Sequence, residues 1–346
     1  MELFGELASI GTSLAYSFGS VVFTFAGRSV GTVLLNRTRL ALALLFTLLL
    51  HLALTGTLYP VSASPGIFGW LAASGVVGYV VGDAFLFEGF VMVGPRLTML
   101  VFASAPVLST IMAWVFLGET LSLVEIAGIV ITIAGIAIVV GDPPKTGRAE
   151  TVHRDPADPD GAFGRETVDL AGAQDRDPTA AAGAFGRDPD DPVRAYGRDR
   201  RQYALGLLAA FGAALGQAGA NLLSKIGLAG GLPAISGNAI RLTAAVIVAW
   251  LLAIFRGQIV SSYRTLREQR RMMGFIVIGT ILGPVIGVWL ALTAVTLAPL
   301  GIVTTLQSLT PIFLIPISYV VFKERIGRRA VIGTLVAIVG SILLFF

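Results

Sequence analysis

The sequence contains no cysteine and only two histidines, His51 and His153. Without a thiol, disulfide bonds, thiolate metal sites and cysteine nucleophiles are excluded. The two histidines lie far apart, one at the end of a predicted helix and one in a polar segment. We therefore expect no histidine-based metal site. A Gly-x4-Gly-Lys-Ser/Thr phosphate loop is also missing, so we expect neither a bound cofactor nor ATP as an energy source within this chain.

Charge is scarce outside one segment of the chain. Of the 21 acidic and 25 basic residues, 13 and 10 lie between Gly141 and Arg201, which leaves 8 and 15 for the rest. Hydrophobic residues make up 55% of the sequence, which is typical of a membrane protein. The remaining basic residues flank apolar runs, so the pI of about 9.6 does not indicate nucleic-acid binding. The expected partners are the lipid bilayer and a small-molecule substrate.

Apolar windows long enough to cross a bilayer as a helix, about 20 residues, recur along the chain. The first follows a segment with two acids and no base, so we expect a transmembrane helix there and not a cleaved signal peptide. The sequence predicts an all-α membrane protein with ten transmembrane helices, at residues 5–27, 33–54, 66–88, 95–117, 121–140, 203–225, 236–255, 272–293, 299–321 and 328–346.

One long stretch occurs twice, at Gly94–Val140 and Ala298–Phe346. Each copy has a proline-headed apolar helix, a charged corner and a glycine-spaced helix. The matching residues are 205 positions apart: Pro106, Glu119, Gly128 and Gly135 in the first copy, and Pro311, Glu324, Gly333 and Gly340 in the second. A weaker match, 202 positions apart, relates Asn36 and Arg39 to Asn238 and Arg241. Five helices is an odd number, so the two sets should enter the membrane from opposite sides as inverted repeats, a pattern typical of transporters.

Residues 142–201 separate the two repeats, 1–141 and 202–346. Their Asp-Pro pairs, many charges and low hydrophobicity predict a disordered linker. The piece Gly-Ala-Phe-Gly-Arg recurs there at 161–165 and 183–187. This recurrence is compatible with a docking motif for a partner, although slippage of a low-complexity tract is the simpler explanation.

The basic residues also predict an orientation. Outside the linker, 13 of the 15 fall on the face that carries the loops after helices 1, 3, 7 and 9, and only Lys225 and Arg241 lie on the other. The positive-inside rule then places that face and the linker in the cytoplasm, with both termini outside.

The repeated pattern is a proline, a later glutamate and two glycines seven positions apart, with an arginine near the start of the second helix of each half, here Arg39 and Arg241. It resembles the EamA-like branch of the drug/metabolite transporter superfamily, and the resemblance covers all ten helices. It implies a ten-helix bundle that moves small polar metabolites or drugs. The central cavity would be lined mainly by the first, third and fourth helices of each half. The resemblance also implies cytoplasmic termini, but we keep the charge-based orientation because the asymmetry of 13 to 2 is strong.

Asp83 is the most informative residue because it lies within the third predicted span. An ionised carboxylate at that depth costs about 2.5–3.5 kcal/mol on insertion scales, so it must face the bundle interior, water or a partner. We interpret it as a proton or substrate-cation site; the alternative is an ion-paired carboxylate that holds helices together. Tyr79 lies one turn earlier on the same face. Glu88 fits a solvated helix end better than a second carrier carboxylate.

Arg39 and Arg241 occupy the first turns of their helices at repeat-related positions. They can gate by pairing with carboxylates or bind an anionic substrate, although snorkelling to the headgroups is the simpler interpretation. Glu119 and Glu324 stand just before the fifth and tenth helices, where a carboxylate caps free N–H groups. We interpret both glutamates as structural corners.

Further candidates for a transport pathway are polar residues of the sixth and ninth spans and an aromatic of the eighth, namely Gln217, Asn221, Thr304, Gln307 and Trp289. The ninth-span residues precede Pro311, whose missing N–H frees a carbonyl. These groups suit a neutral-substrate site or, equally, hydrogen bonds between helices. Gly283 and Pro284 should bend the eighth helix.

We therefore expect a secondary transporter of small metabolites or drug-like solutes in the cell membrane, working by alternating access, and not an enzyme. Proton coupling through Asp83 extends this hypothesis. One alternative is a membrane-embedded enzyme acting on lipids, for which the sequence supplies no His/Cys/Asp grouping. The other is a membrane scaffold or sensor that uses the linker for partners.

Overall fold

The computed structural model describes residues 2–60, 63–118, 120–141, 200–229, 231–297, 306–322 and 327–344. Within these ranges the regular structure is helical, without strands. Eight helices are long and apolar enough to cross a membrane: Leu3–Val30, Thr32–Thr55, Pro65–Met92, Gly94–Leu117, Leu123–Val140, Arg201–Leu228, Ala234–Phe255 and Arg270–Ala291. Their ends agree with the first eight predicted spans to within four residues.

The last two predicted spans, 299–321 and 328–346, contain shorter helices. α14 (Thr310–Phe322) has 13 residues and α15 (Arg328–Leu343) has 16. Residues 298–305 and 345–346 lie outside the described ranges, so the number of ten spans remains a prediction. The same holds for the linker, of which residues 142–199 are not described.

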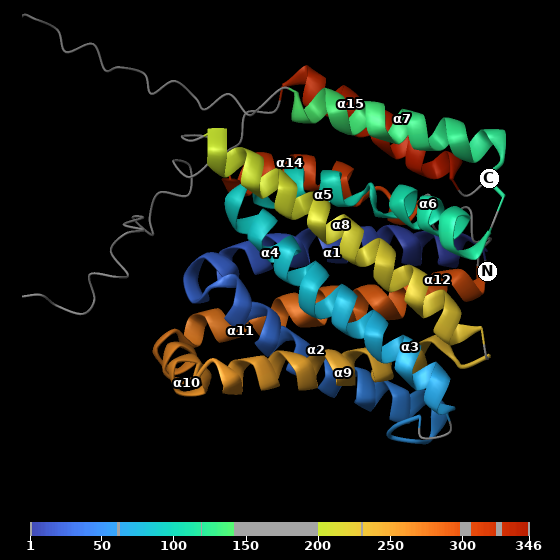
Figure 1. The fold of residues 1–346 in the computed structure, drawn as a ribbon. Helices are drawn as coiled ribbons and strands as arrows, with labels where there is room; N and C mark the ends of the chain where they lie inside the picture. Colours follow the sequence, from blue (N-terminus) through green and yellow to red (C-terminus); the bar gives the residue numbers. More distant parts are fainter. Residues whose placement is uncertain are drawn as a thin grey trace, which may run out of the picture.

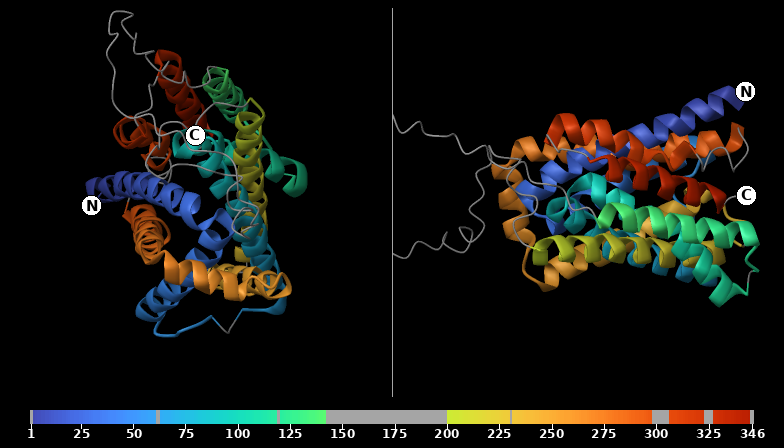
Figure 2. Two further views of the ribbon diagram at one scale, coloured as in Figure 1. Left: turned by 90° about the vertical axis from the view of Figure 1, so that its left-hand side faces the viewer. Right: turned by 90° about the horizontal axis from the view of Figure 1, so that it is seen from above.

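The helices run roughly lengthwise through one bundle, with α7 and α15 side by side at one edge and α2 and α9 at the other (Figures 1 and 2). The elements of the first half are α1 (Glu2–Val30), α2 (Thr32–Thr55), α3 (Pro65–Gly75), η1 (Val76–Gly82), α4 (Asp83–Met92), α5 (Gly94–Phe102), α6 (Ala105–Leu117) and α7 (Leu123–Val140). Those of the second half are α8 (Arg200–Leu228), α9 (Ala234–Phe255), α10 (Ile259–Glu268), α11 (Arg270–Thr280), η4 (Ile281–Gly287), α12 (Val288–Leu297), α14 and α15.

The two halves share the same irregularities at the same spacing. The third helix of each half contains a π-helical turn, η1 in the first and η4 in the second, and the two turns start 205 residues apart. The fourth helix of the first half breaks at residues 103–104, and a turn at 308–309 precedes α14. This is the offset of the sequence repeat. The predicted bend at Gly283-Pro284 falls inside η4, where the proline removes a backbone donor.

α1 is the most buried of the eight long helices. Small hydroxyl side chains line it: Ser9, Thr12, Ser17 and Thr24 each donate to the carbonyl four residues earlier. Their polar atoms are therefore satisfied within the helix, and their small size lets neighbouring helices approach closely.

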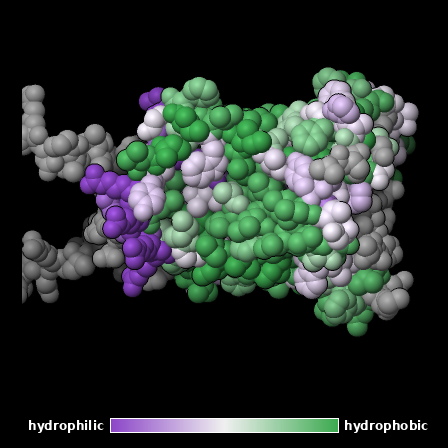
Figure 3. Space-filling view, turned by 90° about the horizontal axis from the view of Figure 1, so that it is seen from below, coloured by the Kyte–Doolittle hydropathy of each residue, from purple (hydrophilic) through white to green (hydrophobic). Residues whose placement is uncertain are grey.

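The two ends of the bundle differ in charge. Both termini lie at one end, whereas the end of α7, the start of α8 and all of α10 lie at the other (Figures 1 and 2). Hydrophilic residues gather at the α10 end, beside a broad hydrophobic belt (Figure 3). They include the exposed arginines Arg256, Arg264, Arg267, Arg270 and Arg271.

The starts of α7 and α15 are described without the two predicted corner glutamates. α7 is capped by Ser122, whose Oγ accepts a hydrogen bond from the Glu125 N–H at 3.2 Å, while the Glu125 carboxylate accepts one from the Ser122 N–H at 2.7 Å. α15 begins after Gly327 without a side-chain cap. Glu119 and Glu324 lie outside the described ranges, so their role as corners stays a prediction.

Candidate functional site

A cavity of about 510 Å³ is bounded by helices from both halves of the chain. Its polar lining comes from Tyr16, Ser20, Arg39, Tyr79, Asp83, Gln217, Asn221, Asn238, Gln307, Ser308, Thr310 and Ser341. Much of its apolar lining is aromatic, with Phe23, Phe87, Phe90 and Phe102. Cavities of this volume, apolar with a few polar groups, are typical of small-molecule sites.

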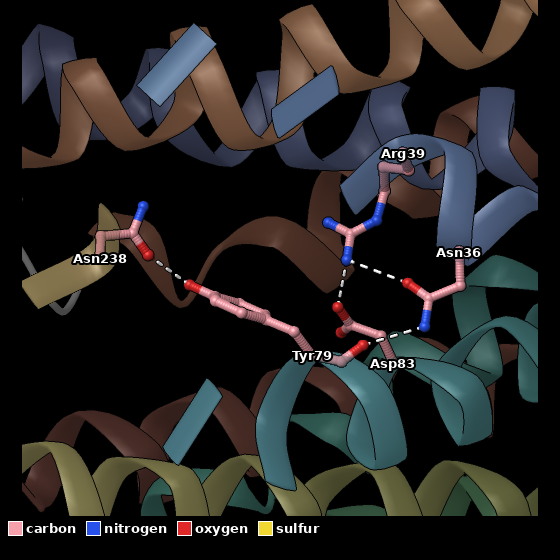
Figure 4. Close-up of polar contacts among 5 residues, drawn as sticks. All are labelled: Asn36, Arg39, Tyr79, Asp83 and Asn238. Atoms are coloured by element: carbon pink, nitrogen blue, oxygen red, sulfur yellow. Dashed lines mark hydrogen bonds and ion pairs between the residues drawn. The ribbon is translucent and has the colours of Figure 1, made fainter. Parts of the chain in front are cut away.

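An ion pair lies in the cavity wall. Asp83 begins α4, directly after the π-helical turn, and its carboxylate accepts a hydrogen bond from Nη2 of Arg39 in α2 (Figure 4). The two side chains are only 14% and 9% exposed. The Arg39 guanidinium also lies 5.3 Å from the centre of the Phe87 ring. Arg39 therefore pairs with a carboxylate, which is one of the roles expected of it, and its buried guanidinium does not snorkel to the headgroups.

Repeat-related residues converge on Tyr79 (Figure 4). Asn36 of α2 donates from Nδ2 to the Tyr79 carbonyl at 2.9 Å, and its Oδ1 accepts from Arg39 at 3.3 Å. Asn238 of α9, its repeat counterpart, accepts a hydrogen bond from the Tyr79 hydroxyl at 2.6 Å. The guanidinium of Arg241 lies 4.7 Å from the centre of the Tyr79 ring. Tyr79 thus joins both halves through the residues that the repeat has in common.

Replacing Tyr79 by phenylalanine should lower the free energy of unfolding by about 1 kcal/mol, because Asn238 Oδ1 loses its donor. Thermal unfolding of the purified protein measures this. Tyr263→Phe is the matched control, since that ring is 68% exposed in α10 and its hydroxyl is expected to contribute little. Equal losses in the two variants would contradict the role given to the Tyr79 hydrogen bond.

A second group of polar side chains lies on α8 and α6. Gln217 donates from Nε2 to Asn221 Oδ1 at 2.9 Å, and Asn221 donates from Nδ2 to Ser109 Oγ at 3.2 Å. Gln217 and Asn221 both line the cavity. The pair therefore offers amide groups to a solute and also ties two helices together, as both interpretations of these residues expect.

The backbone carbonyl that lacks an N–H partner because of Pro311 accepts hydrogen bonds from two hydroxyl groups instead. Gln307 stands four residues before Pro311, and its carbonyl accepts from Ser13 Oγ at 2.9 Å and from Thr310 Oγ1 at 3.1 Å. This backbone group therefore holds α1 against the start of α14. The Gln307 side chain nevertheless lines the cavity, and its Nε2 is buried without an acceptor among the described residues.

The structure divides the predicted pathway residues into three groups. Those that line the cavity are Arg39, Tyr79, Asp83, Gln217, Asn221 and Gln307, whereas Glu88, Arg241 and Trp289 are not part of the lining. Thr304 lies outside the described ranges. Trp289 is 50% exposed. Glu88 is not at a helix end, because α4 continues to Met92, and it accepts a hydrogen bond from Thr32 Oγ1 at 2.9 Å.

Sequence reasoning missed the cavity residues of α1, among them Tyr16, Ser20 and Phe23. Their signal was the series of small hydroxyl residues in the first span, which indicates a helix surrounded by protein. His51 is buried and links two helices, with Nδ1 2.7 Å from the Thr57 carbonyl and Nε2 2.9 Å from Ser236 Oγ. Within the described ranges, no three His, Cys, Asp or Glu side chains come together as metal ligands would.

Comparison with known proteins adds family information to this geometry. The family model described as "EamA-like transporter family" matches residues 3–141 and again 204–346. A solved structure titled only "Crystal structure of protein" has 15% sequence identity to this chain and a TM-score of 0.54. The match covers 98% of this chain and 95% of the other, and at this identity it shows a shared fold alone. Among curated proteins, no sequence matches.

Proposed function

Because the chain belongs to the EamA-like transporter family, a family of multi-pass membrane transporters within the drug/metabolite transporter superfamily, we propose that it is a secondary transporter that moves small solutes across the cell membrane by alternating access. The observation that carries this proposal is the cavity, because its wall combines Arg39 and Asp83 from the first matched segment with Gln217 and Asn238 from the second. Substrate sites at the interface between repeats are typical of secondary transporters.

In this proposal ten spans form two inverted five-helix repeats, 1–141 and 202–346, joined by residues 142–201. The halves rock about the cavity, and η1 and η4 serve as hinges because they interrupt the regular α-helix, and such π-helical turns are frequent at functional sites. The arginine-rich end that includes α10 faces the cytoplasm and the termini face outside, in agreement with the positive-inside rule.

Asp83 is the proposed coupling group. Its carboxylate lines the cavity and pairs with Arg39. A proton taken up by this carboxylate would remove the negative charge that holds Arg39, and α2 and α4 would then lose their ionic contact. This contact lies within the first half and beside the proposed hinge η1, and a local charge change of this kind is a recognised way to bias two conformations.

Uptake by the protein reconstituted in liposomes tests the transport function. A panel of labelled metabolites is offered with and without a pH gradient, and protein-free liposomes give the background. We expect saturable uptake of at least one solute. A variant with residues 142–199 replaced by a short Gly/Ser linker should keep that flux, whereas a scaffold or sensor that depends on the linker would lose its function. Folded protein that moves no solute above background would contradict a transporter.

A further inference from the structure

The charges around the cavity do not balance. Asp83 is the one acidic residue in the described lining, and it is paired with Arg39. Arg241 adds a second guanidinium beside the wall: it stacks on Tyr79, and its chain neighbours Asn238 and Leu242 line the cavity. It also lies within electrostatic reach of Asp83. These three residues together carry a net charge of +1, in a place where low dielectric makes charges act strongly.

One edge of Arg241 has no acceptor. Its Nε and Nη2 atoms are buried, and neither has a hydrogen-bond partner among the described residues. These two nitrogens form a single side of the guanidinium, the fork that holds a carboxylate with two parallel hydrogen bonds. Nε of Arg39 and Nε2 of Gln307 are likewise buried without acceptors. The region therefore has surplus donors as well as surplus positive charge, and buried donors are costly to leave unpaired.

The repeat shows where the missing acceptor would be expected. The two π-helical turns η1 and η4 are 205 residues apart, and the same offset makes Val288 the repeat counterpart of Asp83. Val288 also lines the cavity. The first half thus supplies an acid for its arginine, whereas the second half has a valine at the corresponding position.

We propose that the transported solute carries a single carboxylate, which binds the free edge of Arg241 and supplies the acceptor that the second half lacks. A monoanion balances the charge of +1, whereas a phosphate monoester, with about 1.5 to 2 negative charges, exceeds it. The aromatic wall of Phe23, Phe87, Phe90 and Phe102 suits an apolar body on the same solute. This inference rests on the proposed transport function and specifies its substrate class as monocarboxylates with an apolar body.

Binding at Arg241 should be linked to movement. Both donor atoms are shielded from solvent, and the guanidinium lies against the ring of Tyr79, which itself lines the cavity. Nη2 also lies beside η1, 3.5 Å from the position of a Cβ at Gly78, so a carboxylate reaches these atoms only when η1 and the Tyr79 side chain shift. Substrate binding would then disturb the hydrogen bond from Tyr79 to Asn238, which joins the two halves.

Paired probes test the substrate class. The full-length protein in detergent is titrated with benzoate, 3-phenylpropionate and hexanoate and with their amides, and the shift of the thermal unfolding midpoint gives the affinity. We expect each carboxylate to bind more tightly than its amide. Arg241→Met should weaken carboxylate binding about 10- to 100-fold, the range expected for lost hydrogen bonds to a charged group, and should leave amide binding unchanged.

Two further variants keep the test independent of the folding of Arg241→Met. Val288→Asp keeps the arginine but adds a carboxylate to the cavity wall, so it should also abolish the preference for carboxylates. Arg264→Met removes an exposed arginine that pairs with Glu268 in α10, and it should keep the preference. Equal stabilisation by carboxylate and amide in the wild type, including none by either, would overturn the proposal.

Uptake of the same pairs into liposomes distinguishes the two proposals. Flux of the amides equal to that of the carboxylates would overturn the carboxylate specificity and leave the transporter standing. Absence of flux for every solute in the wider panel would overturn the transport function itself.

Discussion

Asp83→Asn should abolish uptake that is driven by a pH gradient and lower the free energy of unfolding by about 3–5 kcal/mol. The loss of stability follows from the buried pair, because asparagine removes the negative charge and leaves the Arg39 guanidinium, 9% exposed, without its counter-ion. Removing one partner of a buried ion pair typically has a cost of this size. Chemical denaturation of the purified variant measures it.

The loss of gradient-driven uptake in Asp83→Asn has a separate cause. Asparagine neither binds nor releases a proton, so the variant is fixed in one charge state at the position that we propose for coupling. Exchange of labelled for unlabelled solute without a gradient needs no net proton movement. We therefore expect exchange to persist in the folded variant while gradient-driven uptake falls to the level of protein-free liposomes.

Two variants serve as controls for this prediction. Adding Arg39→Gln to Asp83→Asn removes the unpaired charge as well, so the double variant should be more stable than Asp83→Asn alone. Glu88→Gln neutralises a carboxylate of the same helix that lies outside the cavity lining, and it should keep gradient-driven uptake. Gradient-driven uptake that survives in Asp83→Asn would make Asp83 a structural residue and leave a facilitator or exchanger.

The depth of Asp83 could be predicted from the sequence, but its partner could not. A long apolar run places any residue within it at membrane depth, and this rule located the first eight spans as well. Arg39 lies 44 positions before Asp83, on another helix. Their pairing depends on how α2 packs against α4, and the periodicity of one helix carries no information about that. The recurrence of Asn36 and Asn238 was visible, yet not that both contact Tyr79.

The π-helical turns show a similar limit. The second turn was marked in the sequence by Gly283-Pro284, which predicts a bend. The first turn has Tyr79 where the second has Pro284, so no proline indicates it. It could be inferred only by assuming that the bend predicted at Gly283-Pro284 has a counterpart at the repeat-related position of the first half. The same holds for the glycines of α7 and α15, which the sequence shows as matched pairs but not as partners that pack against each other.

Gly135→Ala should separate α7 from α15 and lower the free energy of unfolding by about 1–3 kcal/mol, the usual cost of overpacking. A Cβ at Gly135 would lie 2.2 Å from the backbone nitrogen of Ala337 and 2.6 Å from its Cα. Backbone atoms cannot rotate away as a side chain does, so the helix axes must move apart. The same holds from the side of α15: a Cβ at Gly340 would lie 2.2 Å from the backbone nitrogen of Thr132 in α7.

We expect the whole cost of this separation to appear as lost free energy of unfolding. Helices within a bilayer associate through close packing and not through burial of apolar surface from water, so no other term replaces the lost contact. The thermal unfolding midpoint in detergent reports it. Gly69→Ala is the matched control, since the added carbon has no neighbour within 4 Å beyond the adjoining backbone of its own helix and the change favours the helical conformation of α3. This control should keep or raise the midpoint. If Gly135→Ala left the midpoint as high as the control does, the contact between α7 and α15 would be looser than the backbone distances indicate. The glycines of the repeated motif would then need a reason other than packing.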